Sequence, residues 1–265
     1  MDLGLQDKVA IVTGGSEGIG KAAALGMARE GARVLIVARR PDMLEQAAQE
    51  IKAATEGVVV PVPADVTDRA TAGRVVQAAL DQFGRVDILV NNAGTSMAKG
   101  FEEVSEEDWE GDFNLKVWGA VRFIRAVIPE MRKAGGGRII NVTNLAGRTP
   151  RIASMPTAIS RAAGIAITKG LSKDLAKDNI LVSTVCIGLI KSGQTERRYA
   201  RAKESNPGLT MEGFWVLAAK ERGIPMGRVG EPQEAGDVIT FLASERASYL
   251  TGIAVNIDGG TPAVV

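Results

Sequence analysis

A glycine-rich turn between a strand-like run and a helix-like run limits what this chain can fold into more than any other feature. Residues 8–12 form a short, largely apolar run that predicts a buried strand, and residues 22–29 continue with helix-forming side chains. The glycines between them permit backbone angles closed to other residues, and they let the main chain approach a pyrophosphate that binds the free N–H groups at a helix start. The segment therefore predicts a nucleotide-binding turn, although a tight turn without a ligand also needs glycine. The predicted contact residues of the turn are Gly14, Ser16, Gly18, Ile19 and Gly20.

Strand-like and helix-like stretches alternate along the rest of the chain. This alternation predicts a parallel sheet that carries helices on both faces and is joined by right-handed crossovers. We therefore expect an α/β fold with a Rossmann-type doubly wound parallel sheet, in a single domain over residues 1–265. Strands are expected at residues 8–12, 33–38, 58–61, 88–90, 138–142, 180–186 and 253–257, and helices at residues 22–29, 41–55, 70–83, 105–133, 157–177 and 232–243.

One segment, at about residues 191–228, breaks this alternation. It follows a predicted strand and contains Tyr199, Met211, Phe214 and Trp215. Ligands of open α/β sheets bind beyond the carboxyl ends of the strands, so an apolar insertion at this place predicts a substrate lid. The aromatic residues favour an apolar or ring-containing substrate, and the alternative is that they pack as ordinary core beneath the lid.

Composition excludes several classes of protein. The formal net charge is +1, from 32 basic and 31 acidic residues, which argues against a nucleic-acid surface or an anionic membrane partner. No apolar stretch reaches the roughly 18 residues of a membrane span, and the amino terminus lacks the pattern of a signal peptide, so we expect a cytoplasmic protein. Cys186 is the single cysteine and there is no histidine, which excludes an intrachain disulfide, a Cys/His zinc site and an imidazole base.

Further motifs follow the glycine turn in a fixed order. They are Thr13-Gly14-x-x-x-Gly18-Ile19-Gly20, Asp65-Val66, Asn91-Asn92-Ala93-Gly94, Asn114, Ile139-Ile140-Asn141-Val142 and Ile257-Asp258-Gly259-Gly260. With this order the chain closely resembles the short-chain dehydrogenase/reductase family from residue 8 to residue 260. The resemblance implies that the turn holds a pyrophosphate and that Asp65 and Val66 flank the adenine. It also implies that Asn91, Ala93 and Gly94 form a wall beside the dinucleotide cofactor.

The catalytic positions of that family carry other residues in this chain. The family has a serine at the end of its fifth strand, a tyrosine thirteen residues later and a lysine four residues beyond. Here Asn144, Thr157 and Arg161 stand at these positions, whereas Asn114 is retained. The resemblance also places the backbone of Ile190 beside the nicotinamide carboxamide. We expect these four side chains and this backbone to form the altered site.

This substitution changes the available chemistry. A phenol with a pKa near 10 can be drawn toward neutrality by a neighbouring cation, whereas an aliphatic hydroxyl starts several units higher and is shorter. Arg161 retains a positive charge and can bind ribose hydroxyls, yet its high pKa prevents it from relaying protons as a lysine does. We therefore expect that Thr157 does not replace the missing acid.

Cofactor choice follows from charge at the end of the second strand. An acidic residue about 20 residues past the glycine turn binds the ribose of NAD, and an arginine accepts the extra phosphate of NADP. This chain has Ala38 followed by Arg39, so NADP(H) is favoured over NAD(H). Glu17 in the turn opposes this preference, and the alternative is that Arg39 belongs to a solvated loop.

Three functions are consistent with these residues. The first is an oxidoreductase acting on an apolar carbonyl, an enone or an enoyl thioester, with the enolate held by the altered site. The second is a non-redox lyase or hydratase, and the third is a catalytically silent cofactor-binding homologue. The partner is a small-molecule substrate, and the family resemblance implies a homo-oligomer, a tetramer or dimer, built by the helices at residues 105–133 and 157–177.

Overall fold

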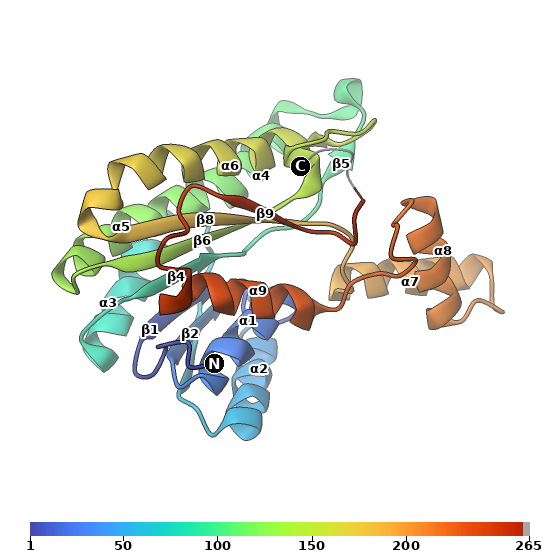
Figure 1. The fold of residues 1–265 in the computed structure, drawn as a ribbon. Helices are drawn as coiled ribbons and strands as arrows, with labels where there is room; N and C mark the ends of the chain where they lie inside the picture. The colour runs from blue at the N-terminus through green and yellow to red at the C-terminus, as the bar shows by residue number, and fades with distance from the viewer. Residues whose placement is uncertain (262–265) are drawn as a thin grey trace.

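A seven-stranded parallel sheet with helices on both faces forms the body of the protein (Figure 1). The computed structural model describes residues 1–261. The strands are β1 (Val9–Thr13), β2 (Arg33–Ala38), β3 (Val59–Pro63), β4 (Ile88–Asn91), β6 (Gly137–Asn144), β8 (Ile180–Ile187) and β9 (Ala254–Ile257). Their order is β3-β2-β1-β4-β6-β8-β9: β2 and β3 are added on one side of β1 and the later strands on the other, so the order of the strands reverses between β1 and β4. This confirms the predicted Rossmann-type doubly wound sheet, and it places the ligand-binding switch point beside the glycine turn.

Helices cover the two faces of the sheet in two groups. The helices on one face are α1 (Gly18–Arg29), α2 (Pro41–Thr55) and α9 (Pro232–Ala243), and those on the other are α3 (Thr71–Phe83), α5 (Gly119–Lys133) and α6 (Thr157–Asp174). Side chains of β1 alternate between the two layers: Ala10 and Val12 pack into the first, and Val9 and Ile11 into the second. Burial of each such valine or isoleucine contributes about 1.5–3 kcal/mol, which makes the apolar strands the stable frame of the site.

The expected helix over residues 105–133 is interrupted in the structure. It consists of α4 (Glu106–Phe113), a five-residue π-helical segment η2 (Asn114–Trp118) and α5. A π-helical turn shifts the register of the side chains that follow, and such turns are frequent at functional sites. The period of the sequence predicts the helix but does not reveal this local change.

Short elements complete the fold. A two-stranded antiparallel ribbon of β5 (Ala98–Lys99) and β7 (Met155–Pro156) was not predicted, because two-residue strands show no alternation. The short 3₁₀ helices are η1 (Phe101–Glu103), η3 (Leu145–Gly147), η4 (Ala176–Asp178) and η5 (Glu245–Ala247). Among the helices of residues 1–261, none is both long and apolar enough to cross a membrane.

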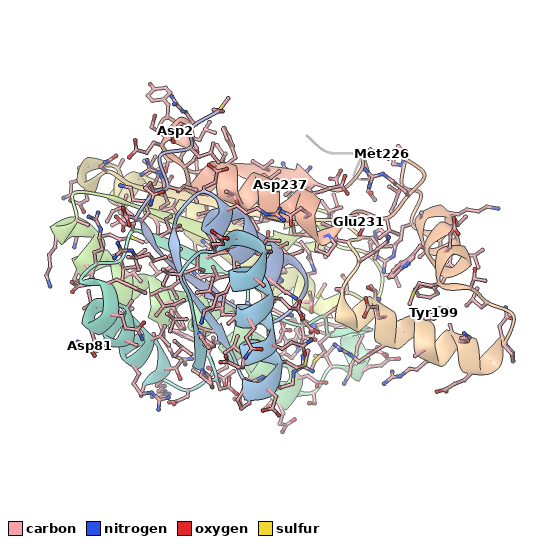
Figure 2. The ribbon with its side chains drawn as sticks, turned by 90° about the horizontal axis from the view of Figure 1, so that it is seen from below. Asp2, Asp81, Tyr199, Met226, Glu231 and Asp237 are labelled. Carbon is pink, nitrogen blue, oxygen red and sulfur yellow. The ribbon has the colours of Figure 1, made fainter. Side chains whose placement is uncertain are left out.

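The insertion forms two helices that project from the body of the molecule (Figure 1). They are α7 (Gly193–Ser205) and α8 (Met211–Glu221). Tyr199 lies between them (Figure 2), with its ring centroid 5.6 Å from that of Phe214 and its hydroxyl donating to the Leu209 carbonyl at 3.1 Å. These contacts hold the two helices together as one unit.

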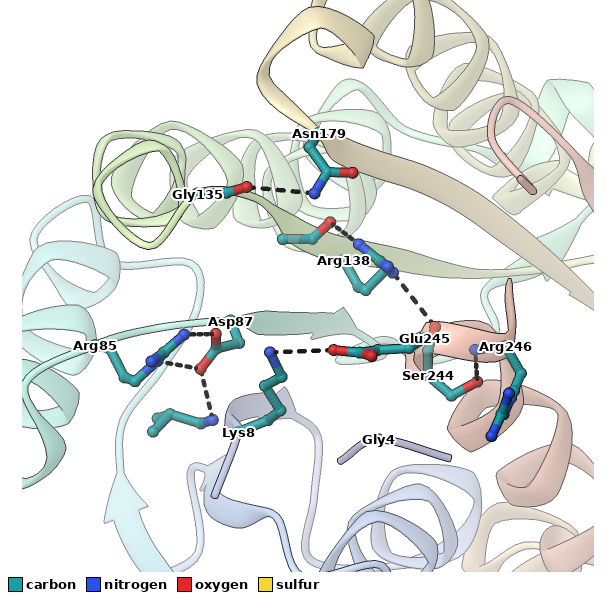
Figure 3. A network of polar contacts seen from close by, with 12 residues as sticks. Gly4, Lys8, Arg85, Asp87, Gly135, Arg138, Asn179, Ser244, Glu245 and Arg246 are labelled. Atoms are coloured by element: carbon teal, nitrogen blue, oxygen red, sulfur yellow. Dashed lines mark hydrogen bonds and ion pairs between the residues drawn. The ribbon is translucent and has the colours of Figure 1, made fainter. Parts of the chain in front are cut away.

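Polar contacts tie the sheet together at the amino ends of its strands (Figure 3). The Asp87 carboxylate accepts the backbone N–H of Val9 at 2.9 Å and is also bound by Arg85. Lys8 reaches Glu245 at 3.6 Å across the same edge. These contacts occupy the amino ends, whereas the carboxyl ends open onto a cleft.

Candidate functional site

A cleft of about 700 Å³ lies over the switch point of the sheet and extends to the insertion. It brings together most of the residues predicted from the sequence. These lining residues are Gly14, Ser16, Gly18, Ile19, Arg39, Asp65, Val66, Ala93, Gly94, Asn144, Thr157, Arg161 and Ile190. Gly20, Asn91 and Asn114 are the predicted site residues that do not line it.

Glycine is required in the turn for two physical reasons. Gly14 and Gly18 have φ values of +69° and +57°, which other residues rarely adopt. A Cβ atom at Gly20 would lie 2.2 Å from the Gly14 carbonyl oxygen, so this glycine permits close packing rather than contact with a ligand. Helix α1 starts at Gly18 without a side-chain cap from Glu17, and its first N–H groups remain available to bind a pyrophosphate.

Asparagine side chains fix the floor and the wall of the cleft. Asn92 donates to the carbonyl oxygens of Thr13 and Gly14, both at 3.0 Å, and so ties the end of β4 to the turn. Asn91 is buried below the cleft and donates to the Asn141 side chain at 3.0 Å. The predicted wall therefore consists of Ala93 and Gly94, with Asn91 supporting it from below.

Arg161 lies against this wall. Its Nη1 donates to the Val142 carbonyl at 2.9 Å, and a Cβ atom at Gly94 would lie 2.6 Å from its Nη2. Within the described part of the chain, its buried Nε has no hydrogen-bond partner. An orphaned buried donor costs free energy, so a ligand oxygen at this place is favoured. The free Nε, the uncapped helix and the glycine cradle fit a bound nicotinamide dinucleotide.

Thr157 is only 3% exposed, and its hydroxyl has several partners. Its Oγ1 donates to the Met97 carbonyl at 2.6 Å and accepts the Met97 N–H at 3.0 Å. It also accepts a hydrogen bond from Lys116 Nζ at 2.8 Å. The single hydroxyl hydrogen is therefore engaged by backbone, and Thr157 fastens the loop between β4 and β5 to the start of α6.

A buried polar cluster lies beneath Thr157. Lys116 pairs with the Asp112 carboxylate, and Ser160 Oγ donates to the other oxygen of that carboxylate at 2.6 Å. Both charged side chains are 1% exposed. Burial, together with the nearby charge of Arg161, lowers the pKa of Lys116 to about 8, and burial lowers the pKa of Arg161 to about 10.

The sequence interpretation did not assign this buried pair. The spacing of Asp112 and Lys116, four residues apart, is a signal that pairs them on one helix face. No spacing rule places the pair under Thr157, because that position depends on the π-helical turn and on the packing of α6.

The two asparagines of the predicted catalytic set have different surroundings. Asn144 accepts the Ala146 N–H through Oδ1 at 3.1 Å, which leaves its amide N–H groups free for a ligand in the cleft. Asn114 donates to the Thr67 carbonyl at 3.4 Å, accepts from Arg122 at 2.9 Å and lines a separate hollow beside α4. The structure thus brings Asn144 to Arg161 and keeps the Asn114 side chain apart from them.

Charges at the end of β2 are arranged asymmetrically. Arg40 pairs with Glu17 at 3.4 Å, so the acidic residue that opposes a phosphate is partly neutralised. Arg39 is exposed in the cleft lining and makes no ion pair or hydrogen bond with residues 1–261. This guanidinium is available for an anionic ligand.

The aromatic residues of the insertion, Tyr199, Phe214 and Trp215, are not among the residues that line the cleft, whereas Ile224 is. Trp215 packs on a small cluster of Ala219, Ile224 and Val229, and its ring lies 5.1 Å from that of Phe214. The aromatic side chains of the insertion therefore pack on one another and on this small cluster, and the apolar substrate stays a prediction.

The parallel sheet, the uncapped helix start and the cleft over the switch point define a dinucleotide-binding oxidoreductase fold. The short chain dehydrogenase family model matches residues 8–203, and the chain belongs to this family. It is an NAD(P)H-dependent oxidoreductase of the short-chain dehydrogenase/reductase type.

Known relatives cover nearly the whole chain. It is 36% identical over 256 residues to 3-oxoacyl-(acyl-carrier-protein) reductase FabG of Thermotoga maritima, covering 97% of this chain and 98% of the relative. L-sorbose reductase from Gluconobacter frateurii, solved with NADPH and L-sorbose, superposes with a TM-score of 0.95 at 36% identity and complete coverage of both chains. An NADPH-bound short chain oxidoreductase from Pseudomonas aeruginosa, described as containing an atypical catalytic center, superposes with a TM-score of 0.91 at 29% identity, covering 98% of this chain and all of that one.

Proposed function

We propose that the protein is an NADPH-dependent reductase of α,β-unsaturated carbonyl compounds, such as enones or enoyl thioesters. The observation that carries this proposal is the state of Thr157, whose hydroxyl hydrogen is held by the Met97 carbonyl at 2.6 Å. The position at which the family has its tyrosine therefore offers no free acid. Reduction of an activated carbon–carbon double bond does not require a general acid at the carbonyl oxygen, whereas reduction of a simple ketone does.

The residues of the cleft match the charge that develops in such a reaction. NADPH held by these residues would supply a hydride to the β-carbon of the substrate, and negative charge would then develop on the carbonyl oxygen. The free amide of Asn144 donates to that oxygen, and the buried charge of Arg161 stabilises it. Water then protonates the enolate at its α-carbon, which gives the saturated carbonyl product. One such positioned donor contributes about 10²–10³-fold in rate.

The cofactor preference rests on two observed features. Arg39 is unpaired in the cleft, and Glu17 is paired with Arg40. A guanidinium binds a phosphate through two parallel hydrogen bonds, so an extra ribose phosphate is favoured. Two structurally similar oxidoreductases were solved with NADPH, which supports the same choice. The residues that hold the cofactor are Gly14, Ser16, Gly18, Ile19, Arg39, Asp65, Val66, Ala93, Gly94, Arg161 and the backbone of Ile190.

The cofactor part of the proposal is tested by calorimetric titration. NADPH should bind about tenfold or more tightly than NADH, since a hydrogen bond to a charged group contributes about 1.5–3 kcal/mol. Arg39→Asp should reverse the preference. Arg29→Asp, which introduces the same charge change at an exposed position outside the cleft, should preserve it. Equal affinities of the wild-type protein for the two cofactors would reject the assignment.

The substrate part is tested by following NADPH absorbance with a matched pair of compounds. Cyclohex-2-enone should be reduced at least ten times faster than cyclohexanone. Faster reduction of the saturated ketone would show that an acid acts in the cleft. Tight NADPH binding without reduction of either compound or of a crotonyl thioester would favour the silent cofactor-binding protein instead.

A further inference from the structure

Positive charge is concentrated in the cleft of a nearly neutral protein. The whole chain has a net charge of +1. The cleft is lined by seven arginines and two carboxylates, those of Glu17 and Asp65. The arginines are Arg39, Arg40, Arg151, Arg161, Arg197, Arg198 and Arg222. A concave wall of one sign attracts ligands of the opposite sign.

Four of the seven arginines lie beside the cofactor-binding residues. Arg39 and Arg40 directly follow β2, and Arg161 lies against Gly94. Arg197 lies near Glu17 of the turn, since a Cβ atom at Gly193 would lie 2.5 Å from the Glu17 carboxylate and 3.3 Å from Arg197 Nη1. These four arginines are accounted for by the cofactor end of the cleft.

The other three arginines, Arg151, Arg198 and Arg222, come from the other end. Arg151 lies in the loop that joins the Asn144 turn to Thr157, Arg198 is on α7, and Arg222 directly follows α8. No carboxylate within residues 1–261 forms an ion pair with any of these three side chains, although acidic residues are abundant elsewhere on the surface. We call this group the arginine triad.

Arg151 and Arg198 lie near enough to Arg222 for their positive charges to act on it. Partial burial of the guanidinium lowers the pKa of Arg222, the charges of Arg151 and Arg198 lower it further, and the charge of Glu221 opposes this shift. All three residues are exposed, so water and salt screen this repulsion, and an anion bound in the cleft would reduce it further. The carboxylates that line the cleft are those of Glu17 and Asp65 in its cofactor-binding part, and Glu221, the acidic charge that acts on Arg222, forms no ion pair with it among residues 1–261.

We propose that the arginine triad binds an oxyanion group of the substrate, a carboxylate or a phosphate, at a distance from the carbon that receives the hydride. Guanidinium groups match both oxyanions through paired N–H donors. The site deepens the proposed reductase function and rests on it, because the Asn144 side chain lies at the other end of the loop that carries Arg151. The substrate is therefore an anionic carbonyl compound rather than an apolar one.

The proposal is tested by calorimetry on protein saturated with NADP⁺, so that no turnover occurs. Levulinate is compared with its neutral methyl ester, and dihydroxyacetone phosphate with neutral dihydroxyacetone. At least one anion should bind ten times more tightly than its neutral counterpart, and the stronger pair identifies a carboxylate or a phosphate as the recognised group. Equal binding within both pairs, or no binding of either anion at millimolar concentration, would overturn the proposal.

Variants locate the site within the cleft. Arg198→Gln and Arg222→Gln should each weaken the favoured anion about tenfold while leaving the affinity for NADP⁺ unchanged. Arg201→Gln is the matched control, because Arg201 is an exposed arginine of the same helix α7 that does not line the cleft. An equal loss in Arg201→Gln would mean that anions bind the general surface charge.

The same titrations separate the two proposals. Loss of anion binding in the triad variants, with normal NADP⁺ binding, would support the arginine triad and would not test the reductase proposal. Failure of the wild-type protein to bind either NADP⁺ or NADPH would reject the reductase proposal, and the anion titrations would then be repeated on the cofactor-free protein. Anion selectivity lost by Arg198→Gln in that protein would still support the arginine triad.

Discussion

The role of the Thr157 hydroxyl can be measured by removing it without changing the shape of the side chain. Thr157→Val replaces the hydroxyl with a methyl group of similar volume. The Met97 N–H and carbonyl lose their partner, and Lys116 loses one acceptor at 2.8 Å while keeping Asp112. The Met97 groups are partly accessible to water, so we expect about 1 kcal/mol for each, and the buried ammonium adds about 1.5–3 kcal/mol. The free energy of unfolding should fall by about 4 kcal/mol in all.

Urea denaturation followed by circular dichroism measures this change. Thr149→Val is the matched control, because the Thr149 hydroxyl donates only to the Leu145 carbonyl of its own turn, at 3.2 Å, and its loss should cost less than about 1 kcal/mol. Limited proteolysis should show faster cleavage between β4 and β5 in Thr157→Val only.

Activity distinguishes a structural hydroxyl from a catalytic one. At a temperature where the variant remains folded, enone reduction by Thr157→Val should stay within a few-fold of wild type. Loss of a general acid would lower the rate about 10²–10⁴-fold. A variant that keeps its stability but loses activity to that extent would refute the structural role assigned to Thr157.

Three further predictions concern other parts of the molecule. Gly94→Ala places a methyl group 2.6 Å from Arg161 Nη2 and should weaken NADPH about tenfold by calorimetry, whereas Gly73→Ala, with no atom within 4 Å, should leave it unchanged. The pKa of Lys116 is lowered from 10.5 to about 8, so between these pH values the unfolded chain binds a proton that the folded chain lacks. The unfolding free energy of wild type relative to Lys116→Met should then rise with pH across this window by up to about 3 kcal/mol, and a flat difference would contradict the assignment. Light scattering at micromolar concentration should report a dimer or tetramer. Trp118→Asp, which changes a half-exposed indole, should shift the protein toward monomer. A monomeric wild type would reject the proposed oligomer.

Several features of this protein were determined by the sequence alone. Each depends on local chemistry: the glycines of the turn on backbone angles, and the strands on apolar runs. The proposed replacements at Thr157 and Arg161 also follow from the sequence, because the two residues lie four apart on one helix, and Asn144 is placed by its position at the end of a predicted strand. Local signals of this kind depend little on the rest of the fold.

The tertiary structure decided which side chains meet. The π-helical segment and the packing of α6 bring Lys116 to the hydroxyl of Thr157, and they leave Asn114 bound to Arg122 outside the cleft. The arginine triad joins a loop, a helix and a helix end that lie far apart in the sequence. The composition, with 32 basic and 31 acidic residues, does not reveal this local positive charge, because a net charge sums over the whole surface. Only folding decides which of these charges remain without a partner and face the same cleft.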